Sequence, residues 1–103
     1  MTISINENLN QLISGGITIV DFIATWSRPC RAQTRIISIF ERKTKGSATV
    51  KQLNIDENRD LAFRLGIQSI PTIIFFKDGK EANRLIGLQP LDALTDVLQS
   101  LMN

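Results

Sequence analysis

The apolar residues of this chain concentrate in three short runs, each of a length that suits one buried strand. The runs occupy residues 17–24 (ITIVDFIA), 48–56 (ATVKQLNID) and 71–76 (PTIIFF). The last run is followed by Asp78-Gly79, a strong signal for a tight β-turn, and then by residues 80–86, KEANRLI. The pattern predicts three buried strands and a fourth strand that returns antiparallel.

Helical signals separate these runs. The predicted helices cover residues 6–14, residues 28–45, residues 58–66 and a last segment that Pro90 opens. Glycines end the first and third helices, as expected at helix C-termini. In the last helix, leucines recur at the i, i+3, i+7 and i+10 positions that are typical of an amphipathic helix. Residues 2–5, TISI, are a candidate edge strand.

The order of the predicted elements is (β)αβαβαββα, which places the chain in the α/β class. Alternating strands and helices favour parallel pairing with right-handed crossovers, and the hairpin adds an antiparallel edge. We therefore expect a central mixed β-sheet with helices on both faces. No internal repeat, linker or low-complexity segment interrupts the chain, so residues 1–103 are predicted to form a single domain.

The longest predicted helix has one apolar side and one basic side. Four residues share a broad apolar face at about 100° per residue: Cys30, Ile36, Ile37 and Phe40. Four arginines lie together on the opposite side: Arg28, Arg31, Arg35 and Arg42. This basic stripe is either a solvated helix face or a surface that steers acidic partners towards Cys30, and the sequence leaves both interpretations open.

Composition is ordinary for a globular protein, with 43% hydrophobic and 21% charged residues. The formal net charge of +2 does not by itself indicate a nucleic-acid partner. No stretch approaches the ~20 apolar residues that span a bilayer, and the first residues lack the features of a signal peptide. We expect a cytoplasmic protein that binds neither nucleic acid nor membrane, and we expect a monomer.

The chain has no histidine and one cysteine, Cys30, which excludes several kinds of chemistry. Ser-His and Cys-His nucleophile pairs, histidine-containing zinc sites and internal disulfides are all impossible. A thiolate-rich metal site is excluded as well, so no metal is expected. Any reaction must use Cys30, carboxylates, lysines or backbone groups.

The single cysteine lies in TWSRPCRAQ, residues 25–33, at the start of the longest predicted helix. Ser27 stands where an N-cap is expected, an interaction worth ~1 kcal/mol, and Pro29 lies in the first turn, where proline is tolerated. Cys30 then falls on the inward side, where it is either a small buried apolar residue or a redox group. Asp21 is also unusual, because a carboxylate inside an apolar strand is costly unless it serves a purpose.

Taken together, these features resemble the thioredoxin family over nearly the whole chain. The matching blocks are VDFIATW at 20–26, PC at 29–30, LNID at 53–56, GIQSIPT at 66–72, FFKDG at 75–79 and Gly87. Each block is short, but their common order and spacing are highly specific. The resemblance implies the thioredoxin fold, a protein-disulfide oxidoreductase that serves cell redox homeostasis, and no bound cofactor.

The family's site has the motif W-C-G-P-C, in which the first cysteine attacks a substrate disulfide and the second resolves the mixed disulfide. Trp26, Pro29 and Cys30 match this motif as they stand. Ser27 occupies the place of the attacking cysteine, and Arg28 that of the glycine. A serine hydroxyl has no usable anion near neutral pH and no base here to generate one, so we expect the chain to be inactive as a dithiol reductase.

Other site residues follow from the resemblance alone. Asp21 matches the buried aspartate that assists proton transfer at the second cysteine, but Gln52 stands where many members carry a lysine that pairs with it. If Asp21 is buried without that cation, desolvation should favour its neutral form. Pro71, after Ile70, matches a proline that is cis in the family, beside which the backbone binds an extended substrate. Gly87 matches the glycine at the rim of the substrate groove.

The implied partners are a thioredoxin reductase as electron donor and protein disulfides bound as extended peptides. The expected catalytic positions are Ser27, Cys30 and Asp21, and the expected substrate-binding residues are Trp26, Arg28, Pro29, Ile70, Pro71 and Gly87. Two alternatives remain open: a redox-independent binding module that uses the groove alone, and a monothiol protein that acts through Cys30. The serine itself is compatible with a replacement introduced into a W-C-R-P-C thioredoxin and with a naturally redox-inactive relative.

Overall fold

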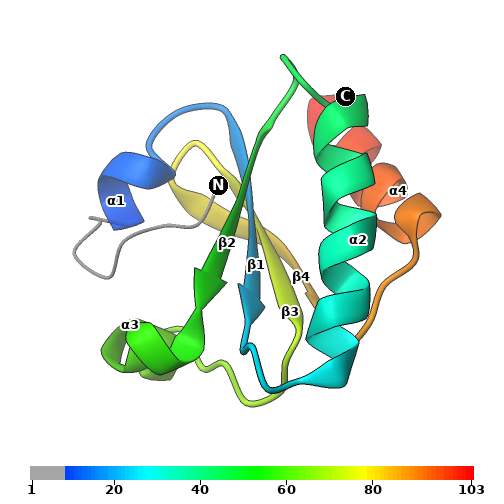
Figure 1. Ribbon diagram of the computed structural model, residues 1–103. Coiled ribbons are helices and arrows are strands. Elements are labelled where there is room, and N and C mark those ends of the chain that lie inside the picture. The colour runs from blue at the N-terminus through cyan, green and yellow to red at the C-terminus, as the bar shows by residue number, and fades with distance from the viewer. Residues whose placement is uncertain (1–8) are drawn as a thin grey trace.

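The computed structural model describes residues 9–103, and Figure 1 shows their arrangement. The predicted strand at residues 2–5 and the first residues of the predicted helix at 6–14 lie outside the described residues. The elements, in order, are α1 (Leu9–Leu12), β1 (Ile17–Ile23), α2 (Arg28–Lys43), β2 (Thr49–Asn54), the 3₁₀ helix η1 (Ile55–Glu57), α3 (Arg59–Arg64), β3 (Thr72–Lys77), β4 (Lys80–Ile86) and α4 (Leu91–Met102). The predicted α/β order is confirmed over this range.

The strands form one four-stranded mixed sheet in the order β2-β1-β3-β4. β1 pairs parallel with β2 and antiparallel with β3, and β3 pairs antiparallel with β4. The expectation of parallel pairing is therefore correct for β2 and wrong for β3. The reason is helix length: the 16 residues of α2 span ~24 Å and return the chain along the sheet, whereas the 6 residues of α3 span only ~9 Å. Consequently β3 starts at the end of the sheet where β2 finishes, as Figure 1 shows.

Helices cover both faces of the sheet, with α2 and α4 on one face and α1 and α3 on the other (Figure 1). Successive side chains of β1 point to opposite faces of the sheet, so this strand contributes to the hydrophobic core on each face. Ile19 packs with residues of α2 and α4, such as Ile37 and Leu94, whereas Val20 and Phe22 pack towards α1 and α3. Within residues 9–103, no helix combines the length and the apolar character needed to cross a bilayer.

The predicted turn at Asp78-Gly79 is confirmed, since both residues adopt positive φ angles, 51° and 87°. The predicted strand at 48–56 is shorter than expected because the chain turns into η1, where the Asn54 side chain accepts a hydrogen bond from the Asp56 amide at 2.8 Å. The predicted helix at 28–45 ends earlier, at Lys43, and the Thr44 side chain then donates to the Phe40 carbonyl.

Candidate functional site

The turn between β1 and α2 carries the cysteine and its surroundings. Ser27 is the N-cap of α2, and its Oγ accepts a hydrogen bond from the Cys30 amide at 3.3 Å. The N-cap prediction is therefore confirmed. Ser27 is 6% exposed and Cys30 only 1% exposed, so the thiol is almost completely covered. A thiol in this position is poorly placed to meet a substrate by itself.

A chain of hydrogen bonds joins Asp21 to the helical turn of Cys30. Gln52 donates from Nε2 to Asp21 Oδ2 at 3.2 Å and to Thr34 Oγ1 at 2.9 Å. The Thr34 hydroxyl in turn donates to the carbonyl oxygen of Cys30 at 2.9 Å. The fold therefore joins the Asp21 carboxyl and the helical turn of Cys30 in one network of hydrogen bonds between β1, β2 and α2.

Asp21 is fully buried, and Gln52 gives it a neutral partner instead of a cation. Burial raises the pKa of the Asp21 carboxyl from 3.8 to about 7, and the hydrogen bond from Gln52 offsets only part of this effect. Among residues 9–103, the second carboxyl oxygen, Oδ1, has no hydrogen-bond partner. The expected preference for the neutral form is confirmed, and near neutral pH this carboxyl can either hold or release a proton.

The predicted substrate-binding segments at Pro71 and Gly87 lie next to each other. The Ile70-Pro71 peptide bond is cis, as the resemblance implies. The Gly87 amide donates to the Pro71 carbonyl at 2.8 Å, which joins the start of β3 to the end of β4. Gly87 has a φ of 88°, a backbone conformation that favours glycine.

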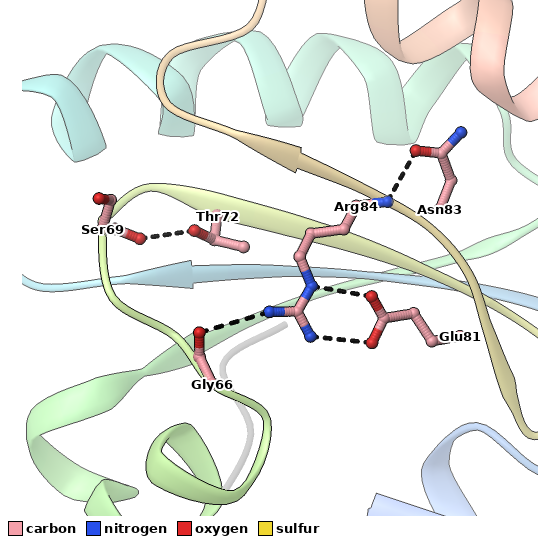
Figure 2. Close-up of polar contacts among 6 residues, drawn as sticks. All are labelled: Gly66, Ser69, Thr72, Glu81, Asn83 and Arg84. Atoms are coloured by element: carbon pink, nitrogen blue, oxygen red, sulfur yellow. Dashed lines mark hydrogen bonds and ion pairs between the residues drawn. The ribbon is translucent and has the colours of Figure 1, made fainter.

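Polar contacts also hold the loop that leads to the cis bond, as Figure 2 shows. Arg84 of β4 donates to both carboxyl oxygens of Glu81 at 2.8 Å, and its Nη1 reaches the Gly66 carbonyl at 3.5 Å. At the other end of the loop, the Thr72 hydroxyl donates to the Ser69 carbonyl at 2.5 Å. The segment that carries Ile70 is therefore held from both β3 and β4.

Trp26 lies at the surface with 67% of its area exposed. Its indole Nε1 donates to Asp56 Oδ2 of η1 at 2.8 Å, a contact that the sequence did not reveal because 30 residues separate the two positions. This bond orients the ring while it leaves most of the aromatic face open to a partner. Arg28 and Pro29 are exposed beside it, and Ile70 is half-buried.

Gln33 is a second residue that sequence reasoning missed. It is fully buried on the inward side of α2, donates to the Gln89 carbonyl at 3.0 Å and accepts from the Gln89 amide at 2.7 Å. These bonds tie α2 to the segment that follows Gly87. The one available signal was its place four residues before Ile37, on the apolar side of the helix.

Two hollows lie away from these residues. One of about 690 Å³ is lined by residues of α1, η1 and α3, and another of about 550 Å³ is lined by residues of α2 and α4. Neither contains a predicted site residue. We place the candidate site on the open surface around Trp26, because an extended peptide that binds through its backbone needs no enclosed cavity. Within residues 9–103, no group of three or more metal-ligating side chains gathers at one place.

Comparison with known proteins agrees with this geometry. Residues 2–100 match the family model named Thioredoxin. The thioredoxin of Chlamydia caviae is 40% identical over 88 residues, which cover 85% of each chain, and that of Chlamydia pneumoniae is 39% identical over 93 residues, 90% of each chain. Among solved structures, chloroplastic thioredoxin z superposes with a TM-score of 0.88 at 32% identity, covering 98% of this chain and 92% of the other. A mutant thioredoxin from Halobacterium salinarum gives a TM-score of 0.89 at 28% identity, covering 100% of this chain and 90% of the other.

Proposed function

Since this chain belongs to the thioredoxin family of thiol-disulfide oxidoreductases, we propose that it binds protein disulfides at the exposed surface of Trp26, Arg28 and Pro29, named here the Trp26 surface. We propose also that Ser27 prevents the chain from reducing these disulfides. Residues 1–103 would act as one domain, in the cytoplasm, without metal or cofactor. The site would then be complete except for one atom, the sulfur of the attacking residue.

The observation that carries this proposal is the position of the Ser27 hydroxyl. It lies at the N-cap of α2, where it accepts from the Cys30 amide, and a sulfur at this position would face the free amides and the positive end of the helix dipole. These two features stabilise a thiolate. A serine hydroxyl remains protonated there, and the chain has no histidine to remove its proton.

The exchange that we infer for this geometry requires sulfur at both positions. A thiolate at position 27 would attack one sulfur of the substrate disulfide and release the other as a thiolate, which forms a mixed disulfide. The Cys30 thiolate would then attack the sulfur at position 27, form an internal disulfide and release the second substrate thiol. Two electrons pass to the substrate, and a thioredoxin reductase would return them. Asp21 would accept or supply the proton of Cys30, because its pKa of about 7 suits both roles.

The test of this proposal compares two single-thiol chains with Ellman's reagent, whose disulfide releases one coloured thiolate for each attack. The folded, unmodified chain should react slowly because Cys30 is 1% exposed, and it should give one equivalent after unfolding. The double variant Ser27→Cys/Cys30→Ala should react at least ~100-fold faster while folded, because its thiol is at the helix N-cap. Comparable slow rates for both folded chains would contradict the proposal, as would rapid reaction of the unmodified chain, which would favour a monothiol function of Cys30.

A further inference from the structure

Three arginines of α2 lie closest to the candidate site: Arg28, Arg31 and Arg35, named here the arginine row. All three are exposed, and their spacing places them along one side of the helix. Arg31 Nη1 donates to the carbonyl oxygen of Thr25 at 3.3 Å, which brings its guanidinium against the turn that carries Trp26. The row therefore borders the surface on which a partner would lie.

No described carboxylate forms an ion pair with the arginine row. The ion pair between Arg84 and Glu81 is the only one within residues 9–103, so no described carboxylate lies within 4.0 Å of a guanidinium of the row. The first turn of α2 contains no acidic residue, and cations at this end of a helix oppose its dipole. Arginines three and four residues apart also repel one another. A face that needed only to be solvated would gain nothing from this unfavourable arrangement, which indicates that a ligand uses the charge.

Charges of opposite sign lie on the two sides of Trp26. The arginine row lies on the α2 side, whereas η1 supplies Asp56 and Glu57, and Asp56 holds the indole through its Nε1. A segment laid across the indole would therefore meet positive potential on one side and negative potential on the other. Such complementarity selects partners and fixes their direction.

We propose that the arginine row binds carboxylates of an extended protein segment, so that the preferred partners of this chain carry Asp or Glu next to their disulfide. The proposal rests on the proposed function for the location of the binding surface, but it needs no thiol exchange. The unmodified chain therefore serves as the test protein, since it binds without turnover. Trp26, the only tryptophan, reports binding through its fluorescence.

The experiment titrates the unmodified chain with two seven-residue peptides, free of tryptophan and cysteine, that share the central sequence Val-Ala-Val. The acidic peptide has two glutamates at one end and two serines at the other and is made in both orders, and the basic peptide has lysines in place of the glutamates. At low ionic strength the acidic peptide should bind about tenfold more tightly, and most of this preference should vanish in 0.5 M salt. The double variant Arg28→Gln/Arg31→Gln should lose most of the preference.

The matched control is Arg42→Gln/Lys43→Gln, which also removes two positive charges from α2, at the end of the helix ~21 Å from Arg28. It should retain the preference for the acidic peptide. Equal affinities for the two peptides, no binding of the acidic peptide, or an equal loss in Arg42→Gln/Lys43→Gln would overturn the proposal. Tighter binding of a thymidine oligonucleotide than of the acidic peptide, with the same dependence on Arg31, would overturn it in favour of a nucleic-acid surface. None of these results would alter the Ellman's reagent comparison, so the two proposals fail separately.

Discussion

The Ser27→Cys variant should reduce insulin disulfides at least ~100-fold faster than the unmodified chain when dithiothreitol supplies the electrons. The expected gain is this large because the substitution supplies the missing nucleophile, whereas the hydroxyl of Ser27 cannot replace it. The other residues to which the proposed function gives roles are present: Cys30 would resolve the mixed disulfide, Asp21 would transfer the proton, and the exposed Trp26 would contact the substrate.

Insulin precipitation measures this directly, with dithiothreitol alone as the background. The unmodified chain should not exceed that background. The double variant Ser27→Cys/Cys30→Ala is the matched control, because it attacks disulfides without resolving them and should show little catalytic turnover. If the Ser27→Cys chain is correctly folded but inactive, Arg28 or Gln52 would be the cause of the inactivity. A redox-independent binding module would then be the better description of the protein's function.

The second large effect concerns the stability of the fold, which should fall as the pH rises from about 4 to about 7. The pKa of Asp21 is about 7 in the folded chain and 3.8 for an unperturbed aspartate, so the folded state holds this proton more tightly than the unfolded state. Stability from this group is therefore fully present below pH 4 and is lost as the pH rises through 7. Since each pKa unit is worth about 1.4 kcal/mol, the loss is about 4 kcal/mol.

Replacement of Asp21 by asparagine should remove this loss. The Asp21→Asn side chain stays neutral at every pH and can still accept from Gln52. Its free energy of unfolding in urea, followed by circular dichroism, should match that of the unmodified chain at pH 4 and exceed it by about 4 kcal/mol at pH 8. Asp96→Asn, at an exposed position of α4, should leave the pH dependence unchanged. If the free energies of unfolding of the Asp21→Asn and unmodified chains change with pH in the same way, burial does not raise the pKa of Asp21, and the prediction is wrong.

The elements were predictable because each depends on neighbours in sequence. The β-branched runs, the Asp78-Gly79 turn and the Ser27 cap all express local preferences, and the structure contains each of them. The direction of β3 was predicted wrongly, because the alternating order of elements suggested a full crossover. The short length of the predicted helix at 58–66 indicates the antiparallel direction of β3, since a helix of this length cannot return the chain along the sheet.

The site was predictable only in part. The motif placed Ser27 and Cys30, and the depletion of carboxylates from strands drew attention to Asp21. The bonds that orient this cluster join residues far apart in the chain, such as Trp26 to Asp56. Such pairs depend on how η1 and the turn before α2 approach each other in three dimensions, and no spacing rule in the sequence encodes them.

In the proposed function, position 27 and Cys30 form a redox pair from which one sulfur is missing. The most direct test of this pairing is the intact mass of the folded Ser27→Cys chain after incubation with oxidised glutathione. We predict the loss of two hydrogen atoms without a retained glutathione, since Cys30 should displace glutathione from position 27 to form an internal disulfide. A stable glutathione adduct, or two thiols that remain reduced, would mean that the two positions do not form a pair and would contradict the account.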